Sequence, residues 1–130
     1  MTNLLPIIIS ALIQIETGGH PDPADSVGDQ GRAIGILQLH PIMVEEVNRI
    51  TGLKYHESDR YSPTLSERMA YAFLEYQYRR GVTDPVALAC RWNRPNGDPN
   101  PAYWTKVILA LEGALQAKHD TTNNNTNTGE

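Results

Sequence analysis

Glu16 is the residue whose type and surroundings are best suited to acid–base chemistry. It follows the apolar residues Ile13 and Ile15 and precedes Thr17 and two glycines, so we expect it where a helix ends. Apolar neighbours that keep water away from a carboxyl group raise its pKa, and the group can then stay protonated near neutral pH. Such an acid can donate a proton to a leaving oxygen. The alternative is a solvated glutamate at a helix end.

Two other kinds of site have weaker support. His20, Asp22 and Asp25 could ligate a metal, but prolines separate them and their spacing is irregular, so we assign no metal and no cofactor. Cys90 is the only cysteine and lies in the apolar run at residues 86–90. We therefore expect a buried thiol rather than a nucleophile, and no intrachain disulfide.

The elements that must position Glu16 are predicted to be helices. Residues 4–16 are apolar on nearly every side, which indicates a first helix surrounded by the rest of the fold. Two glycines and two prolines in residues 17–23 then turn the chain. The glycine-rich stretch that follows predicts an irregular loop or small hairpin, with residues 34–39 as its only strand-like part.

Proline signals and apolar spacing predict four further helices. Each of these helices is expected to begin at a proline, and the four prolines are Pro41, Pro63, Pro85 and Pro101. Ser62 and Asp84 precede two of them as caps, and Gly52 stops the helix that Pro41 begins. A break is expected over residues 93–101, and the last apolar stripe ends near Lys118.

Composition and charge exclude several classes of protein. The chain has 130 residues, 40% of them hydrophobic and 20% charged, which is typical of one soluble domain. We place that domain at residues 1–119 and expect the Asn- and Thr-rich residues 120–130 to be a disordered tail. A net charge of -4 argues against a nucleic-acid partner. The apolar stretch near the N-terminus lacks preceding Lys or Arg and is shorter than the about twenty residues that span a bilayer, so we expect neither a signal peptide nor membrane insertion.

Three short motifs follow one another along the chain. They are Glu16-Thr17 with two glycines, Gly-Ile-Leu-Gln ending at Gln38, and Arg-Trp-Asn ending at Asn93 before a helix that contains Tyr103. In this order they resemble the lytic transglycosylase and goose-type lysozyme families of the lysozyme-like superfamily. Each motif alone is weak, but their order over residues 13–107 is specific.

The resemblance implies a mainly α, lysozyme-like helical domain with a small glycine-rich hairpin or loop. It also implies a peptidoglycan glycosidase that cleaves between N-acetylmuramic acid and N-acetylglucosamine. Glu16 would be its general acid and base, with Thr17, Gln38, Asn93 and Tyr103 lining a cleft between the first helix and the Asn93 region.

Each of these residues has a structural alternative. Gln38 could anchor a loop, Asn93 could form a turn, and Tyr103 could be core. The family's usual Ala-Tyr-Asn is Arg91-Trp92-Asn93 here, which departs from the pattern before the Asn and weakens that assignment.

Asp29 decides which reaction the resemblance implies. Its segment is similar to one in which goose-type lysozymes carry an aspartate thought to place water. If Asp29 faces Glu16 across the cleft, inverting hydrolysis is expected, since inverting carboxyl pairs stand roughly 6.5 to 9.5 Å apart. Otherwise Glu16 works alone, as in lytic transglycosylases, where the sugar's own 6-hydroxyl closes an anhydro ring. A third possibility is a turn-forming loop residue.

Other classes of function remain as alternatives. A non-catalytic glycan-binding or structural protein could keep the fold, but it would not need an acid at position 16. A helical interaction module would leave the glycine-rich loop unexplained. Without an evident export signal, we expect a chain made in the cytoplasm that acts on the cell wall, either phage-encoded or a domain of a larger protein. We expect it to be a monomer whose partner is the peptidoglycan glycan strand.

Overall fold

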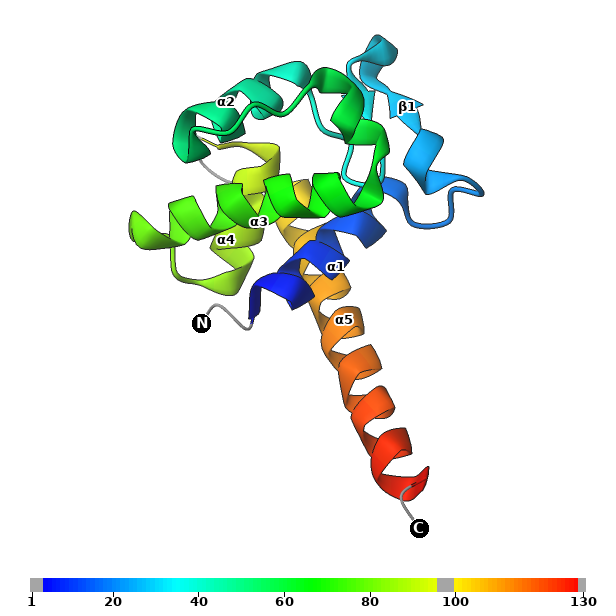
Figure 1. Cartoon of the computed structure of the whole chain (residues 1–130). Coiled ribbons are helices and arrows are strands. Elements are labelled where there is room, and N and C mark those ends of the chain that lie inside the picture. The colour runs from blue at the N-terminus through cyan, green and yellow to red at the C-terminus, as the bar shows by residue number, and fades with distance from the viewer. Residues whose placement is uncertain (1–3, 96–99, 129–130) are drawn as a thin grey trace.

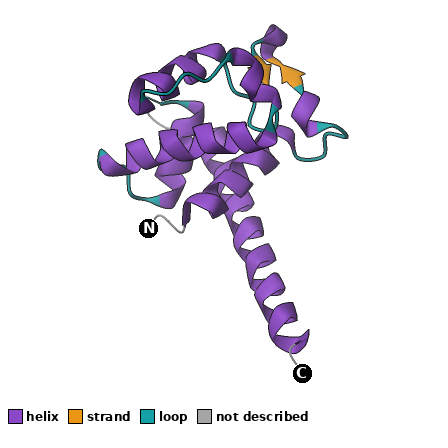
Figure 2. Ribbon diagram, viewed as in Figure 1, coloured by secondary structure: helices purple, strands orange, loops and turns teal. Residues whose placement is uncertain are grey.

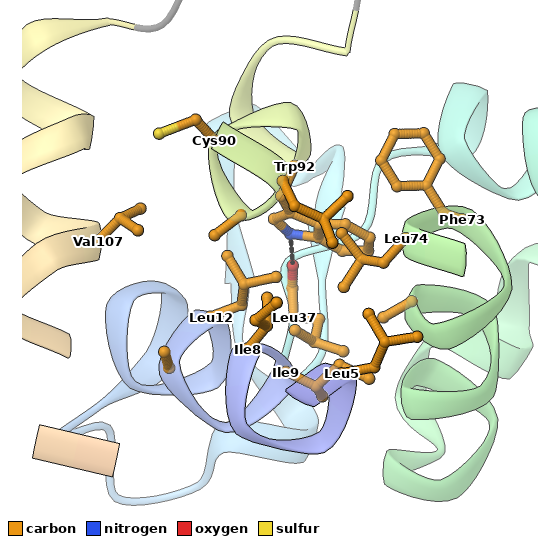
Figure 3. Packing of buried hydrophobic residues seen from close by; sticks show 14 of the residues in the cluster. Leu5, Ile8, Ile9, Leu12, Leu37, Phe73, Leu74, Cys90, Trp92 and Val107 are labelled. Carbon is orange, nitrogen blue, oxygen red and sulfur yellow. Dashed lines mark hydrogen bonds between the residues drawn. The ribbon is translucent and has the colours of Figure 1, made fainter. Parts of the chain in front are cut away.

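Helix α1 (Leu5–Thr17) packs against α3, α4 and α5, but it is not surrounded on every side as predicted, because Pro6, Ser10 and Gln14 form an exposed face. A computed structural model describes residues 4–95 and 100–128, and shows α1 crossing the other helices at the middle of the fold (Figure 1). Leu5, Ile8 and Leu12 are almost fully buried in the core that these helices share (Figure 3). The predominance of helix confirms the mainly α class.

The helices begin where the prolines predict. Their bounds are α2 Pro41–Thr51, α3 Pro63–Arg79, α4 Pro85–Asn93 and α5 Pro101–Thr128. The Ser62 hydroxyl caps α3 by accepting a hydrogen bond from the Leu65 amide at 3.2 Å. The Asp84 carboxylate caps α4 in the same way. These caps satisfy amide groups that have no partner within the helix. Within the predicted break before α5, residues 96–99 lie outside the described part of the chain.

The glycine-rich stretch forms a very small hairpin. Strand β1 (Val27–Gly28) pairs antiparallel with β2 (Ala33–Ile34), with Val27 opposite Ile34 (Figure 2). The 3₁₀ turn η2 (Pro23–Asp25) precedes the hairpin, η3 (Asp29–Gly31) connects its two strands, and η4 (Glu57–Tyr61) lies between α2 and α3. The predicted strand over residues 34–39 is wrong, because the chain turns at residues 35–38 and only a single bridge joins Ile34 to Leu39.

Gly35 is the physical reason for this turn. Its φ of +85° lies in the left-handed region that residues with a side chain rarely adopt. A Cβ at this position would also stand 2.0 Å from the Arg60 carbonyl oxygen. The apolar residues of the segment suit a strand, but the chain reverses here because position 35 has a left-handed backbone and no room for a side chain.

Arg60 supports the 35–38 turn through hydrogen bonds. It is only 5% exposed, which is unusual for a charged residue. Its Nη1 donates to the carbonyl oxygens of Arg32 at 2.8 Å and Leu39 at 2.9 Å. Its Nε donates to the Glu57 carbonyl oxygen at 2.8 Å. One buried guanidinium therefore joins η4 to the segments on both sides of the 35–38 turn.

Helix α5 extends further than the apolar stripe predicts. The apolar stripe predicts a helix end near Lys118, but α5 continues to Thr128 and its C-terminal half projects from the other helices (Figure 1). The division into a domain at residues 1–119 and a tail at residues 120–130 stays a prediction. The stripe reports only where a helix is buried, whereas the backbone hydrogen bonds of a helix can continue beyond that point. Residues 129–130 are outside the described ranges. No helix in the described ranges is long and apolar enough to cross a membrane.

Candidate active site

Glu16 lies in the last turn of α1 with its side chain half-buried. Its carboxylate Oε1 accepts a hydrogen bond from the Tyr103 hydroxyl at 3.2 Å. Burial raises the pKa of the Glu16 carboxyl above its ordinary value, and the contact with Tyr103 and the more distant charge of Lys106 oppose this only in part. The protonated form of Glu16 is therefore more favoured than that of a solvated glutamate.

Tyr103 enters the site from the first turns of α5. Only 8% of its side chain is exposed, so the predicted core position is correct as far as burial goes. Burial, followed by the nearby Glu16 carboxylate, raises the pKa of the phenol, and the hydroxyl stays a hydrogen-bond donor across the ordinary pH range. The same residue therefore packs in the core and contacts the candidate acid.

Replacing Tyr103 with Phe should raise the pKa of Glu16 further, because the hydroxyl stabilises the ionised carboxylate. An acid must be protonated to act, so the alkaline limb of the pH–activity profile should move to higher pH. The profile of glycan cleavage in wild type and Tyr103→Phe measures this shift. An unchanged or acid-shifted limb would show that the hydroxyl does not act on Glu16.

Thr17 is buried next to the candidate acid. Its hydroxyl is within hydrogen-bond distance of two carbonyl oxygens, that of Ile36 at 2.8 Å and that of Ile13 at 3.3 Å. Only 5% of the residue is exposed. These contacts make Thr17 a positioning residue that ties the end of α1 to the 35–38 turn. The predicted contact of Thr17 with substrate stays a prediction.

Gln38 is the last residue of the 35–38 turn, and its side-chain amide stabilises the turn through hydrogen bonds. Its Nε2 lies within hydrogen-bond distance of the Gly35 carbonyl oxygen at 3.0 Å, the Ser26 hydroxyl at 3.2 Å and the Ser26 carbonyl oxygen at 3.3 Å. This is the loop-anchoring role that the sequence leaves open. Gln38 also lines a hollow, so anchoring and substrate contact are compatible.

That hollow brings Gln38 and Asn93 together. Its volume is about 230 Å³, and it lies between the start of α2 and the end of α4. Its lining residues are Gln38, Leu39, His40, Ile42, Met43, Trp92, Asn93 and Pro95. Asn93 is the last residue of α4 and is exposed, as a residue that contacts substrate must be. Glu16 is not among the lining residues of this hollow.

Trp92 fixes the position of Asn93. Its indole Nε1 donates to the Leu37 carbonyl oxygen at 3.1 Å within the core (Figure 3). The aromatic ring that replaces the family's Tyr before the Asn therefore attaches α4 to the 35–38 turn. Trp92 also packs edge-on against Phe73, with ring centroids 5.8 Å apart.

The 35–38 turn is the common support of the candidate site. Thr17 binds it from α1, and Trp92 binds it from α4. Glu16 and Asn93 are the sequence neighbours of these two anchors, and Gln38 belongs to the turn itself. The three motifs are thus held around one backbone segment. Motifs that are far apart in the sequence therefore meet at one site in the fold.

Asp29, unlike the half-buried Glu16, is an exposed carboxylate with charged partners. Its carboxylate is exposed and lies 3.2 Å from His40 Nε2 and 3.6 Å from Arg32 Nη2. No hydrogen bond or ion pair joins it to Glu16 in the described part of the chain. Its φ of +49° is typical of a tight turn. A catalytic role for Asp29 stays a prediction.

The acidic segment before the hairpin has local partners. His20 Nδ1 accepts a hydrogen bond from the Asp22 amide at 3.0 Å. Contact with Asp22 raises the pKa of the Asp25 carboxyl. Among residues 4–95 and 100–128, no group of three or more His, Cys, Asp and Glu side chains could hold a metal ion. Cys90 is buried, as predicted.

The sequence reasoning missed three residues that shape the site. Lys106 acts on Glu16 through its charge, and its place one turn after Tyr103 on the same helix face could have indicated it. His40 pairs with Asp29 and lines the Gln38–Asn93 hollow. Arg60 supports the turn, but no local pattern distinguishes it from a surface arginine.

The family model of the transglycosylase SLT domain matches residues 1–125. That family is generally enzymatic and acts on peptidoglycan. No curated protein and no solved structure matched the chain. Because the family match covers almost the entire chain, the chain belongs to the transglycosylase SLT domain family, within the lysozyme-like superfamily.

Proposed function

We propose that this protein is a peptidoglycan lytic transglycosylase that cleaves the glycan strand between N-acetylmuramic acid and N-acetylglucosamine. The observation that carries the proposal is the half-buried Glu16 carboxyl, which burial favours in its protonated form beside the Tyr103 hydroxyl. Membership in the SLT family supports the same substrate. A glycan-binding protein without activity would gain nothing from an acid held in this way.

In the proposed reaction Glu16 acts twice. It first donates its proton to the glycosidic oxygen, and the bond from that oxygen to C1 of the muramic acid residue breaks. The Glu16 carboxylate then takes the proton from the 6-hydroxyl of the same sugar as its oxygen bonds to C1. The products are a 1,6-anhydro end and a new free hydroxyl. No water is consumed, and Glu16 is restored to its acid form.

The surroundings of the two carboxylates support a reaction with a single acid. An inverting hydrolase would need a second carboxylate to activate water on the opposite face of the sugar. Asp29 is the sequence candidate, but Arg32 and His40 already pair with it. The Tyr103 hydroxyl stabilises Glu16 when it is ionised, which is the form that must accept the second proton.

Digestion of purified peptidoglycan, followed by mass spectrometry of the product ends, tests the proposal. Wild type should release anhydro ends, and Asp29→Asn should release the same ends at a rate within about threefold of wild type, as expected for a surface residue outside the chemistry. Reducing ends from wild type, together with loss of activity in Asp29→Asn, would establish hydrolysis with Asp29 as the second carboxylate.

A further inference from the structure

A second hollow, with a volume of about 540 Å³, lies where α2, α3 and the end of α4 meet. Its lining is rich in charged groups and includes Glu46, Arg49, Tyr76, Arg80, Arg91 and Pro95. Pro95 also lines the Gln38–Asn93 hollow. The two hollows are therefore neighbours on the molecule, and a ligand that fills one could extend toward the other.

The positive charges of this hollow, which we call the arginine hollow, are only partly compensated. Glu46 pairs with Arg49, whose Nε lies 3.0 Å from Glu46 Oε2. Within the described residues, no carboxylate lies within ion-pair distance of Arg80 or Arg91. Their polar contacts are neutral: Arg80 Nη1 donates to the Tyr76 hydroxyl at 3.1 Å, and Arg91 Nη1 donates to the Pro95 carbonyl oxygen at 2.9 Å.

Tyr76 holds two of the guanidinium groups in place. The Arg80 and Arg49 Cζ atoms lie 5.4 Å and 5.9 Å from the centroid of its ring, a favourable cation–π arrangement. Arg49, followed by Arg80, also lowers the pKa of the Tyr76 hydroxyl. The hollow thus stabilises negative charge, although the chain as a whole carries a net charge of -4.

We propose that the arginine hollow binds a carboxylate of the acidic peptide that peptidoglycan carries on its glycan strand. A guanidinium group donates two parallel hydrogen bonds to a carboxylate, which gives both charge and direction to the contact. The shared Pro95 places this contact next to the hollow where Gln38 and Asn93 meet. The inference rests on the proposed function, because it takes the glycan strand to be the substrate.

Phosphate groups have the same recognition chemistry, and some cell-wall polymers carry them. The peptide and the phosphate-bearing polymers can be removed from the cell wall by different treatments. Treatment with an amidase strips the peptide from the glycan, whereas mild hydrofluoric acid removes phosphate-linked polymers and leaves the peptide. Fragments prepared in these two ways therefore separate the carboxylate of the peptide from a phosphate.

Binding measured in a Glu16→Gln background tests the inference without cleavage of the ligand. Soluble glycan fragments that carry the peptide and lack phosphate are titrated by calorimetry, alongside fragments without peptide. Adding Arg80→Gln or Arg91→Gln should weaken binding of the peptide-bearing fragments about tenfold, the scale of one charge-assisted contact. Binding of the peptide-free fragments should not change. Arg80→Lys should restore part of the affinity, because it restores the charge.

Arg79→Gln is the matched control. It removes the same charge one residue away, but Arg79 pairs with Glu75 at 2.7 Å outside the arginine hollow, so affinity should not change. Melting temperatures check that Arg91→Gln, which loses its contact with Pro95, is folded. The inference is wrong if Arg80→Gln leaves the affinity unchanged, if it weakens both fragments equally, or if only phosphate-bearing fragments respond. Failure of the proposed function would show separately, as absence of cleavage by the wild type.

Discussion

Glu16→Gln should lower glycan cleavage about a thousandfold, since a positioned general acid contributes roughly 10² to 10⁴ in rate. The amide keeps the shape of the side chain and can still accept a hydrogen bond from Tyr103, but it has no acidic proton to transfer to the glycosidic oxygen. The same substitution should stabilise the fold near neutral pH. Loss of activity with a gain in stability is the expected signature of a residue retained for catalysis.

The sign of the stability change follows from the raised pKa. A carboxyl whose pKa is higher in the folded state than its ordinary 4.5 favours folding most when it is protonated. Its contribution is fully present below pH 4.5 and is lost as the pH rises through the folded-state value. Because Gln has no such loss, the advantage of Glu16→Gln should be absent at low pH and should appear as the pH approaches neutrality.

Thermal unfolding of both proteins across this pH range measures the change, and release of soluble products from peptidoglycan measures activity. Glu45→Gln is a suitable control, because Glu45 is an exposed glutamate on α2 that lines neither the Gln38–Asn93 hollow nor the arginine hollow. It should leave both activity and the pH dependence of stability unaltered. Full activity of Glu16→Gln would contradict the proposed function.

Arg60→Met should lower the free energy of unfolding by about 3 kcal/mol, the scale expected when a buried charged group loses its hydrogen bonds. Met keeps most of the volume of the side chain, so the effect reports the lost hydrogen bonds to Arg32, Leu39 and Glu57 rather than a cavity. Activity should also fall, since the 35–38 turn carries Gln38 and anchors Thr17 and Trp92.

Urea unfolding followed by circular dichroism gives the free energy of unfolding for wild type and Arg60→Met. Arg68→Met serves as the control, because Arg68 is an exposed arginine on α3, where a substitution should change stability by no more than about 0.5 kcal/mol. Equal stabilities for Arg60→Met and Arg68→Met would show that the buried guanidinium does not support the turn.

Local signals predicted the helices well. A proline after a capping residue gives the start of α3 and α4, and Gly52 in the left-handed conformation ends α2. These signals act through backbone groups within one turn, so a sequence read in short windows contains them. The position of Glu16 at the end of α1 followed from the same kind of reasoning.

Contacts between distant segments could not be predicted in this way. Whether the 34–39 segment is a strand depends on the Arg60 carbonyl, which blocks a side chain at Gly35. Burial of Arg60 depends in turn on carbonyl groups 21 and 28 residues away. The resemblance to a family made Tyr103 a residue of the cleft, but spacing alone left it equally suited to the core, and its hydrogen bond to Glu16 was not predicted. The end of α5 was misplaced because apolar periodicity stops before the helix does.

The hydrogen bond between Glu16 and Tyr103 joins side chains 87 residues apart, one on the first helix and one on the last. Synthesis delivers the chain from its N-terminus, so the acid leaves the ribosome long before its partner does. A nascent chain that has folded α1 to α4 therefore lacks the group that stabilises the ionised acid. The contact between the acid and the Tyr103 hydroxyl can therefore form only after α5 has been synthesised and has packed against α1.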